Sequence, residues 1–171
     1  VVSFIKMPVD ALGFTLAPTY QSQQTKGNYE TASRIYEGAL FHGLLVYLPA
    51  TAGLALISEP FIRLIFGEQY LGAVPILRIM MIYALMLAVS TLTSDALDYL
   101  GRARERSIIR TVSAVANVVL NVILIPWIGV EGAALATVVT YSAYTFVTVY
   151  LMLSEMEIRV IGLIRSLVSV F

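Results

Sequence analysis

The sequence predicts an all-α fold, a polytopic transmembrane bundle of about five spanning helices with one short interfacial helix. Hydrophobic residues make up 58% of the chain and charged residues 13%, whereas soluble domains carry about 25% charged residues. Long apolar runs alternate with short charged clusters, and the hydrocarbon core of a bilayer takes ~20 helical residues. One side chain that ionises near neutral pH, His42, lies within these runs, which cover 39–57, 79–92, 111–128 and 132–153. We therefore expect these runs to cross a membrane as helices.

The first half of the chain contains two expected spans and the interfacial segment. The first helix is expected over about 3–24 and the second over about 29–58. Pro49 is expected to kink the second helix, because proline removes a helical hydrogen bond. The segment EPFIRLIF, 59–66, is amphipathic and too short to span, so we expect it to lie flat in the membrane interface.

The second half contains three expected spans. They cover about 71–100, 107–127 and 131–154, and Gly129 marks the turn between the last two. A further apolar stretch, 160–171, is read as the start of another helix. Because the chain begins at Val1 and ends at Phe171 inside apolar sequence, we expect it to be an internal part of a longer membrane protein.

The distribution of basic residues predicts the orientation. Eight lysines and arginines fall in the segments that follow the first, third and fifth expected helices, and two, Arg63 and Arg78, fall on the opposite side. Basic residues are enriched on the cytoplasmic side of membrane proteins. The first group is therefore expected in the cytoplasm, and the protein is expected to be a multi-pass component of the cytoplasmic, or inner, cell membrane.

Composition also limits the chemistry of this chain. The formal net charge is zero, which argues against a nucleic-acid partner. Cysteine is absent, so disulfides and thiolate sites are excluded, and the single histidine excludes a metal site built on several histidines.

The helix expected over 71–100 ends with two carboxylates, Asp95 and Asp98. At spacings of three and four residues they share a helix face with small side chains: Ala84, Ala88 and Thr91. Carboxylates that face lipid are costly, so this face should point into the bundle as a cation, proton or substrate-hydroxyl site. In the alternative interpretation both carboxylates lie at headgroup depth and pair with Arg102 or Arg106.

An enzymatic alternative rests on the same two residues. Asp95 and Asp98 form a DxxD pattern, which can hold Mg²⁺ against a diphosphate. Membrane CDP-alcohol transferases use a longer aspartate motif with a glycine after its first aspartate, but Ala96 takes that position here and no second aspartate pair follows. We therefore keep a membrane-embedded phosphotransferase as an alternative, and favour a non-enzymatic protein without a cofactor or metal.

Four other residues are candidates for a substrate or ion pathway. His42 lies in an apolar span, where a histidine is a functional candidate, although a neutral imidazole bonded to a neighbouring helix is the alternative. Lys6 and Asp10 lie four residues apart and can form a salt-bridged pair inside a cavity. Asn117 is the fourth, and it lies on a polar stripe with Ser113 and Asn121.

Helix packing offers another explanation for the polar stripe. Small residues recur at the same spacing in the next helix, at Gly132, Ala136 and Thr140. Such stripes let membrane helices approach closely and hydrogen-bond. The aromatic residues of that helix either stack on sugar rings or serve as packing and interface anchors: Tyr141, Tyr144 and Tyr150.

Four stretches of the chain, taken in order, carry a family resemblance. They are TLAPTYQSQQTKGNYETASRIYEGAL (15–40), IRLIFGEQYLGAVPILRI (62–79), YLGRARERSIIRTVSAVANVVLNVILIP (99–126) and GVEGAALATVVTY (129–141). With these stretches the chain resembles the C-terminal half of polysaccharide-biosynthesis flippases, the O-antigen and lipid-linked oligosaccharide exporters of the multidrug/oligosaccharidyl-lipid/polysaccharide superfamily. The order of the stretches is more specific than any one of them.

The resemblance implies an architecture and a function. Residues 1–171 would form part of a C-terminal helical bundle in a two-bundle transporter, which works by alternating access around a central cavity. The implied cargo is a polyprenyl-diphosphate-linked oligosaccharide carried by a membrane lipid, with a polymerase or glycosyltransferases as protein partners. Multidrug efflux and lipid II transport are the alternatives within the same superfamily.

Overall fold

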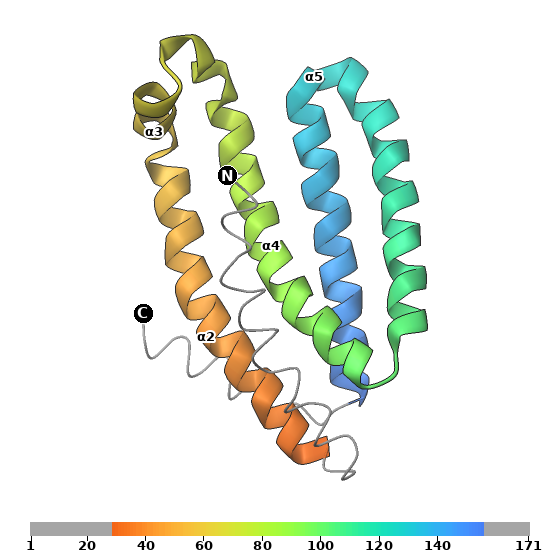
Figure 1. Cartoon of the computed structure of the whole chain (residues 1–171). Coiled ribbons are helices and arrows are strands. Elements are labelled where there is room, and N and C mark those ends of the chain that lie inside the picture. Colours follow the sequence, from red (N-terminus) through yellow and green to blue (C-terminus); the bar gives the residue numbers. More distant parts are fainter. Residues whose placement is uncertain (1–28, 156–171) are drawn as a thin grey trace.

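The computed structural model describes residues 29–155, and every regular element in that range is a helix (Figure 1). The predicted fold class, an all-α membrane helical bundle, is confirmed for this part of the chain. The expected helix at 3–24, the stretch at 160–171 and the candidate pair Lys6 and Asp10 lie outside the described residues.

The first half of the described chain forms one long helix and two short ones. α2 spans Tyr29–Leu56 with Pro49 inside it, and α3 spans Ser58–Ile65. A 3₁₀ helix, η1, follows over Glu68–Ala73 after Gly67, whose φ of 93° is accessible to glycine at little cost. α3 presents apolar side chains at its end, since Leu64 and Ile65 are 88% and 58% exposed. Its position in a membrane interface stays a prediction.

Two long helices make up the rest. α4 spans Val74–Tyr99, and α5 spans Ala103–Glu155. α5 is interrupted at Ile128 and Gly129, where Gly129 has a φ of 63°. The chain reverses there, so that a first arm (103–127) and a second arm (130–155) run antiparallel (Figure 1). The two arms correspond to the helices expected over 107–127 and 131–154, but the first arm begins earlier than expected, at Ala103.

α4 is the centre of the bundle and contacts both α2 and α5 (Figure 1). Its contact with α2 forms the buried core, together with one residue from the end of α5. The buried members are Tyr36, Ala39, Leu40, Tyr47, Ala88, Leu92, Ala96, Leu97 and Met152. The Tyr36 hydroxyl and the Thr93 Oγ1 atom are 2.8 Å apart in this core. A polar pair in an apolar interface is stabilised because each group satisfies the other.

Three helices among the described residues are long and apolar enough to cross a membrane: Ser33–Leu56, Glu68–Tyr99 and Ala103–Ser154. The third one reverses at Gly129, so each of its arms supplies one span of the ~20 residues that a bilayer requires. The outer surface of the first arm is apolar, as expected for a lipid-facing surface; Val112, Val115, Val118, Val119, Val122 and Ile123 are exposed there.

Candidate functional site

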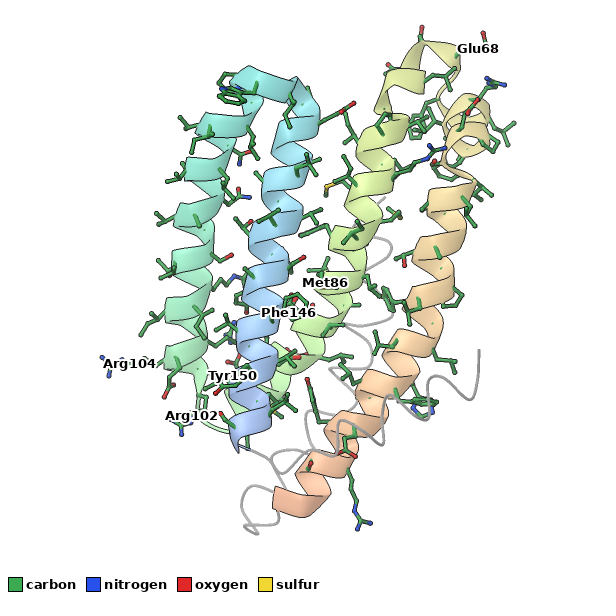
Figure 2. The ribbon with its side chains drawn as sticks, turned by 180° about the vertical axis from the view of Figure 1, so that it is seen from behind. Glu68, Met86, Arg102, Arg104, Phe146 and Tyr150 are labelled. Carbon is green, nitrogen blue, oxygen red and sulfur yellow. The ribbon has the colours of Figure 1, made fainter. Side chains whose placement is uncertain are left out.

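A polar cavity of about 500 Å³ lies between α4 and the two arms of α5. One face of α4 supplies most of the lining, the start of the first arm supplies two arginines, and the second arm supplies two tyrosines. The lining residues are Tyr83, Leu87, Ser90, Thr91, Ser94, Asp95, Asp98, Arg106, Arg110, Tyr141 and Tyr144. The cavity extends from the turn between α4 and α5 toward the middle of the bundle. Figure 2 shows Arg102 and Arg104 at this end, far from Glu68 at the other.

An ion pair lies at the end of the cavity beside the α4–α5 turn, which we call the cavity mouth; the Asp98 side chain is 39% exposed there. The Arg106 guanidinium donates to both oxygens of Asp98, with Nε–Oδ1 at 2.6 Å and Nη2–Oδ2 at 2.8 Å. The Arg106 side chain is only 16% exposed, and it also interacts with the Tyr144 hydroxyl. The turn at Gly101, where φ is 78°, allows the two helices to bring these residues together. For Asp98, the interpretation that it pairs with Arg106 agrees with the structure, whereas Arg102 pairs with Glu105 at 2.8 Å.

Asp95 lies one helical turn deeper than Asp98 and is half-buried. It belongs to the cavity lining together with Thr91, whose hydroxyl donates to the Leu87 carbonyl at 2.8 Å. The structure therefore brings the two predicted carboxylates into one cavity but gives them different surroundings. Both oxygens of Asp98 are bonded to one guanidinium, whereas Asp95 is further from the turn and lines the cavity beside Ser94 and Thr91.

Three tyrosines form a connected row along the cavity. The ring centroids of Tyr83 and Tyr141 are 4.9 Å apart in an edge-to-face arrangement, and those of Tyr141 and Tyr144 are 5.5 Å apart. Serines on α4 bond to this row: Ser90 donates to the Tyr141 hydroxyl at 3.3 Å, and the Ser94 and Tyr144 hydroxyls are 3.0 Å apart. Aromatic pairs in such geometry stabilise one another beyond the area that they bury.

Asn117 occupies a different place, the contact between the two arms of α5. Its Nδ2 donates to Thr140 Oγ1 at 3.0 Å, and Asn121 Nδ2 donates to Asn117 Oδ1 at 2.9 Å. Ser113 Oγ also donates to the Thr140 carbonyl at 2.9 Å. These bonds agree with the alternative interpretation of the stripe as a helix-packing device. Asn117 does not line the cavity with Asp95.

His42 lies on the exposed side of α2, as far as the described residues define that side. Its Nδ1 is 2.7 Å from the Gly38 carbonyl of the same helix, and its ring packs edge-to-face on Phe41. The imidazole thus bonds to its own helix rather than to a neighbouring one. It is not among the residues that line the cavity.

The sequence interpretation missed several cavity residues. Tyr83, Ser90 and Ser94 lie one position away from the stripe of Ala84, Thr91 and Asp95, so they occupy the neighbouring strip of the same helix surface. Their polarity at spacings of seven and four residues, which keep one helix face, is a usable signal. Arg106 and Arg110 lie at the expected start of the helix over 107–127, and their place in the cavity follows from the turn at Gly101.

The structure shows the surroundings of the DxxD pattern, on which the enzymatic alternative rests. Between residues 29 and 155, no three carboxylate, histidine or thiol side chains are grouped so that they can hold a metal ion. In addition, Asp98 uses both oxygens on Arg106, so the DxxD pair does not present two free carboxylates to one ion.

Comparison with known proteins finds three relatives of low identity. The chain is 28% identical over 131 residues to an uncharacterized membrane protein of Methanocaldococcus jannaschii. The aligned region covers 77% of this chain and 26% of that protein. The chain is 24% identical over 149 residues to a probable low-salt glycan biosynthesis flippase of Haloferax volcanii, with coverages of 87% and 32%. It is 28% identical over 149 residues to the lipid II flippase MurJ of Bacillus subtilis, with coverages of 84% and 27%.

These similarities support a place for the chain in the flippase superfamily. Two of the three relatives are named as flippases and the other as a membrane protein. The chain spans about a quarter to a third of the length of these relatives. No family model and no solved structure matches it. The relatives and the candidate spans together support a multi-pass membrane protein.

Proposed function

We propose that the protein to which this chain belongs is a flippase, which moves a polyprenyl-diphosphate-linked oligosaccharide from the inner to the outer leaflet of the cytoplasmic membrane. The observation that carries this proposal is the cavity between α4 and α5. It gathers four charged side chains and three tyrosines inside a bundle whose outer surface is apolar.

The cavity has the properties that such transport requires. Charged groups inside a membrane are costly, and they occur mostly where they face a water-filled cavity or line a substrate path. A polar head group needs hydrogen-bonding partners while it crosses, whereas its lipid tail can remain against apolar helix surfaces. The volume of the cavity, about 500 Å³, is in the range of pockets that bind small organic groups, about 300–1,000 Å³.

The expected orientation places the cavity mouth on the side where cargo is loaded. The basic residues near the α4–α5 turn are expected in the cytoplasm, and the turn at Gly129 is expected outside. Cargo assembled by glycosyltransferases on the cytoplasmic face would then enter near the pair of Asp98 and Arg106. A polymerase on the outer face would receive it after alternating access.

The named relatives support two cargoes of related chemistry. The Haloferax volcanii relative is named for glycan biosynthesis, and the Bacillus subtilis relative is named for lipid II. We favour a lipid-linked oligosaccharide and keep lipid II as the second candidate. The described part of the cavity does not favour multidrug efflux, because its charged side chains are two carboxylates and two guanidinium groups, without an excess of negative charge that would attract a cationic drug.

Transport by the purified full-length protein tests the proposal. Proteoliposomes are prepared with a fluorescent lipid-linked oligosaccharide, fluorescent lipid II or ethidium, and protein-dependent movement between the two sides of the membrane is measured. We expect movement of the lipid-linked oligosaccharide well above that of empty liposomes. Movement of lipid II alone would favour the second candidate, and movement of ethidium alone would contradict the proposal.

A further inference from the structure

We propose that the cavity between α4 and α5 binds a sugar ring of the cargo rather than its diphosphate, with Tyr83 and Tyr141 as the stacking platform and Asp95 as the acceptor for sugar hydroxyl groups. This inference rests on the proposed function and specifies which part of the cargo this cavity holds.

The tyrosine row supplies the apolar half of a sugar site. The face of an aromatic ring carries negative potential, which attracts the polarised C–H groups on one face of a pyranose. Tyr83 and Tyr141 are half-buried members of the lining, whereas Tyr144, also in the lining, is only 4% exposed and packs against Tyr141. The bond from Ser90 to the Tyr141 hydroxyl fixes this ring in advance, which lowers the entropy lost on binding.

Asp95 and its neighbours supply the polar half. A carboxylate accepts charge-assisted hydrogen bonds and has about four lone-pair positions, enough for adjacent sugar hydroxyls in addition to existing partners. Thr91 and Arg110 line the same cavity and add a hydroxyl and a guanidinium. Aromatic rings, a carboxylate and a guanidinium donor in one cavity match the two kinds of surface of a pyranose, which is apolar on its face and polar around its rim.

The charge balance distinguishes a sugar from a diphosphate. Among residues 29–155 the charged lining consists of Asp95 and Asp98 against Arg106 and Arg110, so the formal charges of this described lining cancel. The Nε and Nη2 atoms of Arg106 donate to the two oxygens of Asp98, so this pair of donors is not available to bind a phosphate group. Positive charge that is not already paired favours recognition of a diphosphate, whereas a neutral polyhydroxyl group is bound by a combination of donors and acceptors without net charge. The balanced cavity fits the second requirement.

Binding of matched probes tests the inference in the full-length protein. Dissociation constants are measured by calorimetry for farnesyl diphosphate and for farnesyl diphosphate carrying one glucose, galactose or N-acetylglucosamine. We expect the wild-type protein to bind at least one sugar-bearing probe tenfold or more tightly than the sugar-free probe. Tyr141→Ala and Tyr83→Ala should remove this preference without weakening the binding of farnesyl diphosphate itself.

Two controls separate ring stacking from general damage. Tyr141→Phe keeps the ring and should keep the sugar preference. Tyr150→Ala removes a tyrosine that is 74% exposed, outside the cavity on the same arm, and should change nothing. Thermal unfolding identifies any variant that does not fold. If Tyr141→Ala does not fold, the result for Tyr83→Ala decides whether the sugar preference depends on the tyrosines, because Tyr83 lies at the end of the row.

The outcomes distinguish this inference from the proposed function. A sugar preference that survives both alanine variants, or a wild-type protein without preference for any of the three sugars, overturns the sugar site. Transport of the lipid-linked oligosaccharide in proteoliposomes would leave the proposed function standing in either case. A wild-type protein that transports no lipid-linked probe would instead overturn the proposed function.

Discussion

The two faces of α4 differ in kind. Toward α2, the helix packs small and branched apolar residues, with Ala88 and Leu92 each 4% exposed and Ala96 fully buried. Toward α5, the same helix presents hydroxyls and carboxylates to a cavity, where Ser90 and Ser94 bond to tyrosines and Asp98 pairs with Arg106. The first face is closed and mostly apolar, and the second is open and polar.

This difference indicates that one face of α4 serves packing and the other serves function. Membrane helices gain no hydrophobic stabilisation from leaving lipid for one another, so close packing of small residues holds α2 and α4 together. The polar face is costly in a membrane, and such costs are typical of functional surfaces. We therefore expect changes on the α2 face to affect stability, and changes on the α5 face to affect transport.

The first test concerns the side of the membrane that the cavity mouth faces, and its expected effect is all-or-none. In a cysteine-free background of the full-length protein, a cysteine at Ala103, beside the mouth, should react with a membrane-impermeant maleimide only from the cytoplasm. A cysteine at Val130, which is 69% exposed beyond the turn of α5, should react only from outside. Labelling of Ala103→Cys from outside in intact cells would invert the orientation and move the mouth to the releasing side.

The closed face is tested by a cavity-forming substitution. Leu97 is fully buried in the α2–α4 core, so Leu97→Ala should lower the free energy of unfolding by about 2–4 kcal/mol. Leu56→Ala, at a position on α2 that is 80% exposed, is the matched control and should have little effect. Unfolding in mixed micelles measures both. Equal, small losses would show that this face does not hold the bundle together.

The open face depends on the antiparallel arms of α5, which Gly132 allows to approach. A Cβ atom at this position would lie 2.6 Å from the Leu124 carbonyl oxygen, too close for any real contact. Gly132→Ala should therefore destabilise the pair of arms by about 1–3 kcal/mol, in the range found for overpacked cores.

Gly53 provides the control for that substitution. A Cβ atom there meets nothing within 4 Å, so Gly53→Ala in α2 should raise stability by about 0.5–1 kcal/mol. Thermal unfolding of the two variants should thus show shifts of opposite sign. A neutral Gly132→Ala would mean that the arms are not held as closely as described.

The sequence predicted the helices better than it predicted their faces. The apolar runs and Gly129 were sufficient for the fold class, because length and glycine conformation are local properties. The face on which His42 or Asn117 lies is not local, since the lipid-facing and core-facing sides of a membrane helix are both apolar and periodicity does not distinguish them.

Which residues meet in the cavity also depends on the tertiary arrangement of the helices. Whether Asp98 pairs with Arg102 or Arg106 depends on the direction of the chain after Gly101, and the structure selects Arg106. Tyr83 joins the cavity only because the second arm returns to place Tyr141 against it. The functional roles of Asp95, Asp98, His42 and Asn117 stay predictions, as do those of Lys6 and Asp10.

The central claim is that the open face of α4 carries transport, and a comparison of its two carboxylates tests this claim most directly. Export of lipid-linked sugar is measured in cells that lack their own flippase, for the full-length Asp95→Asn and Asp98→Asn variants, and is normalised to the amount of folded protein. We predict that Asp95→Asn folds but loses at least tenfold in export, about 1.4 kcal/mol on the limiting barrier. Asp98→Asn should lose much less, because Asp98 is already paired with Arg106 at the cavity mouth. Equal and mild effects of the two substitutions would contradict the claim and leave Asp95 as an ordinary carboxylate at the end of a helix.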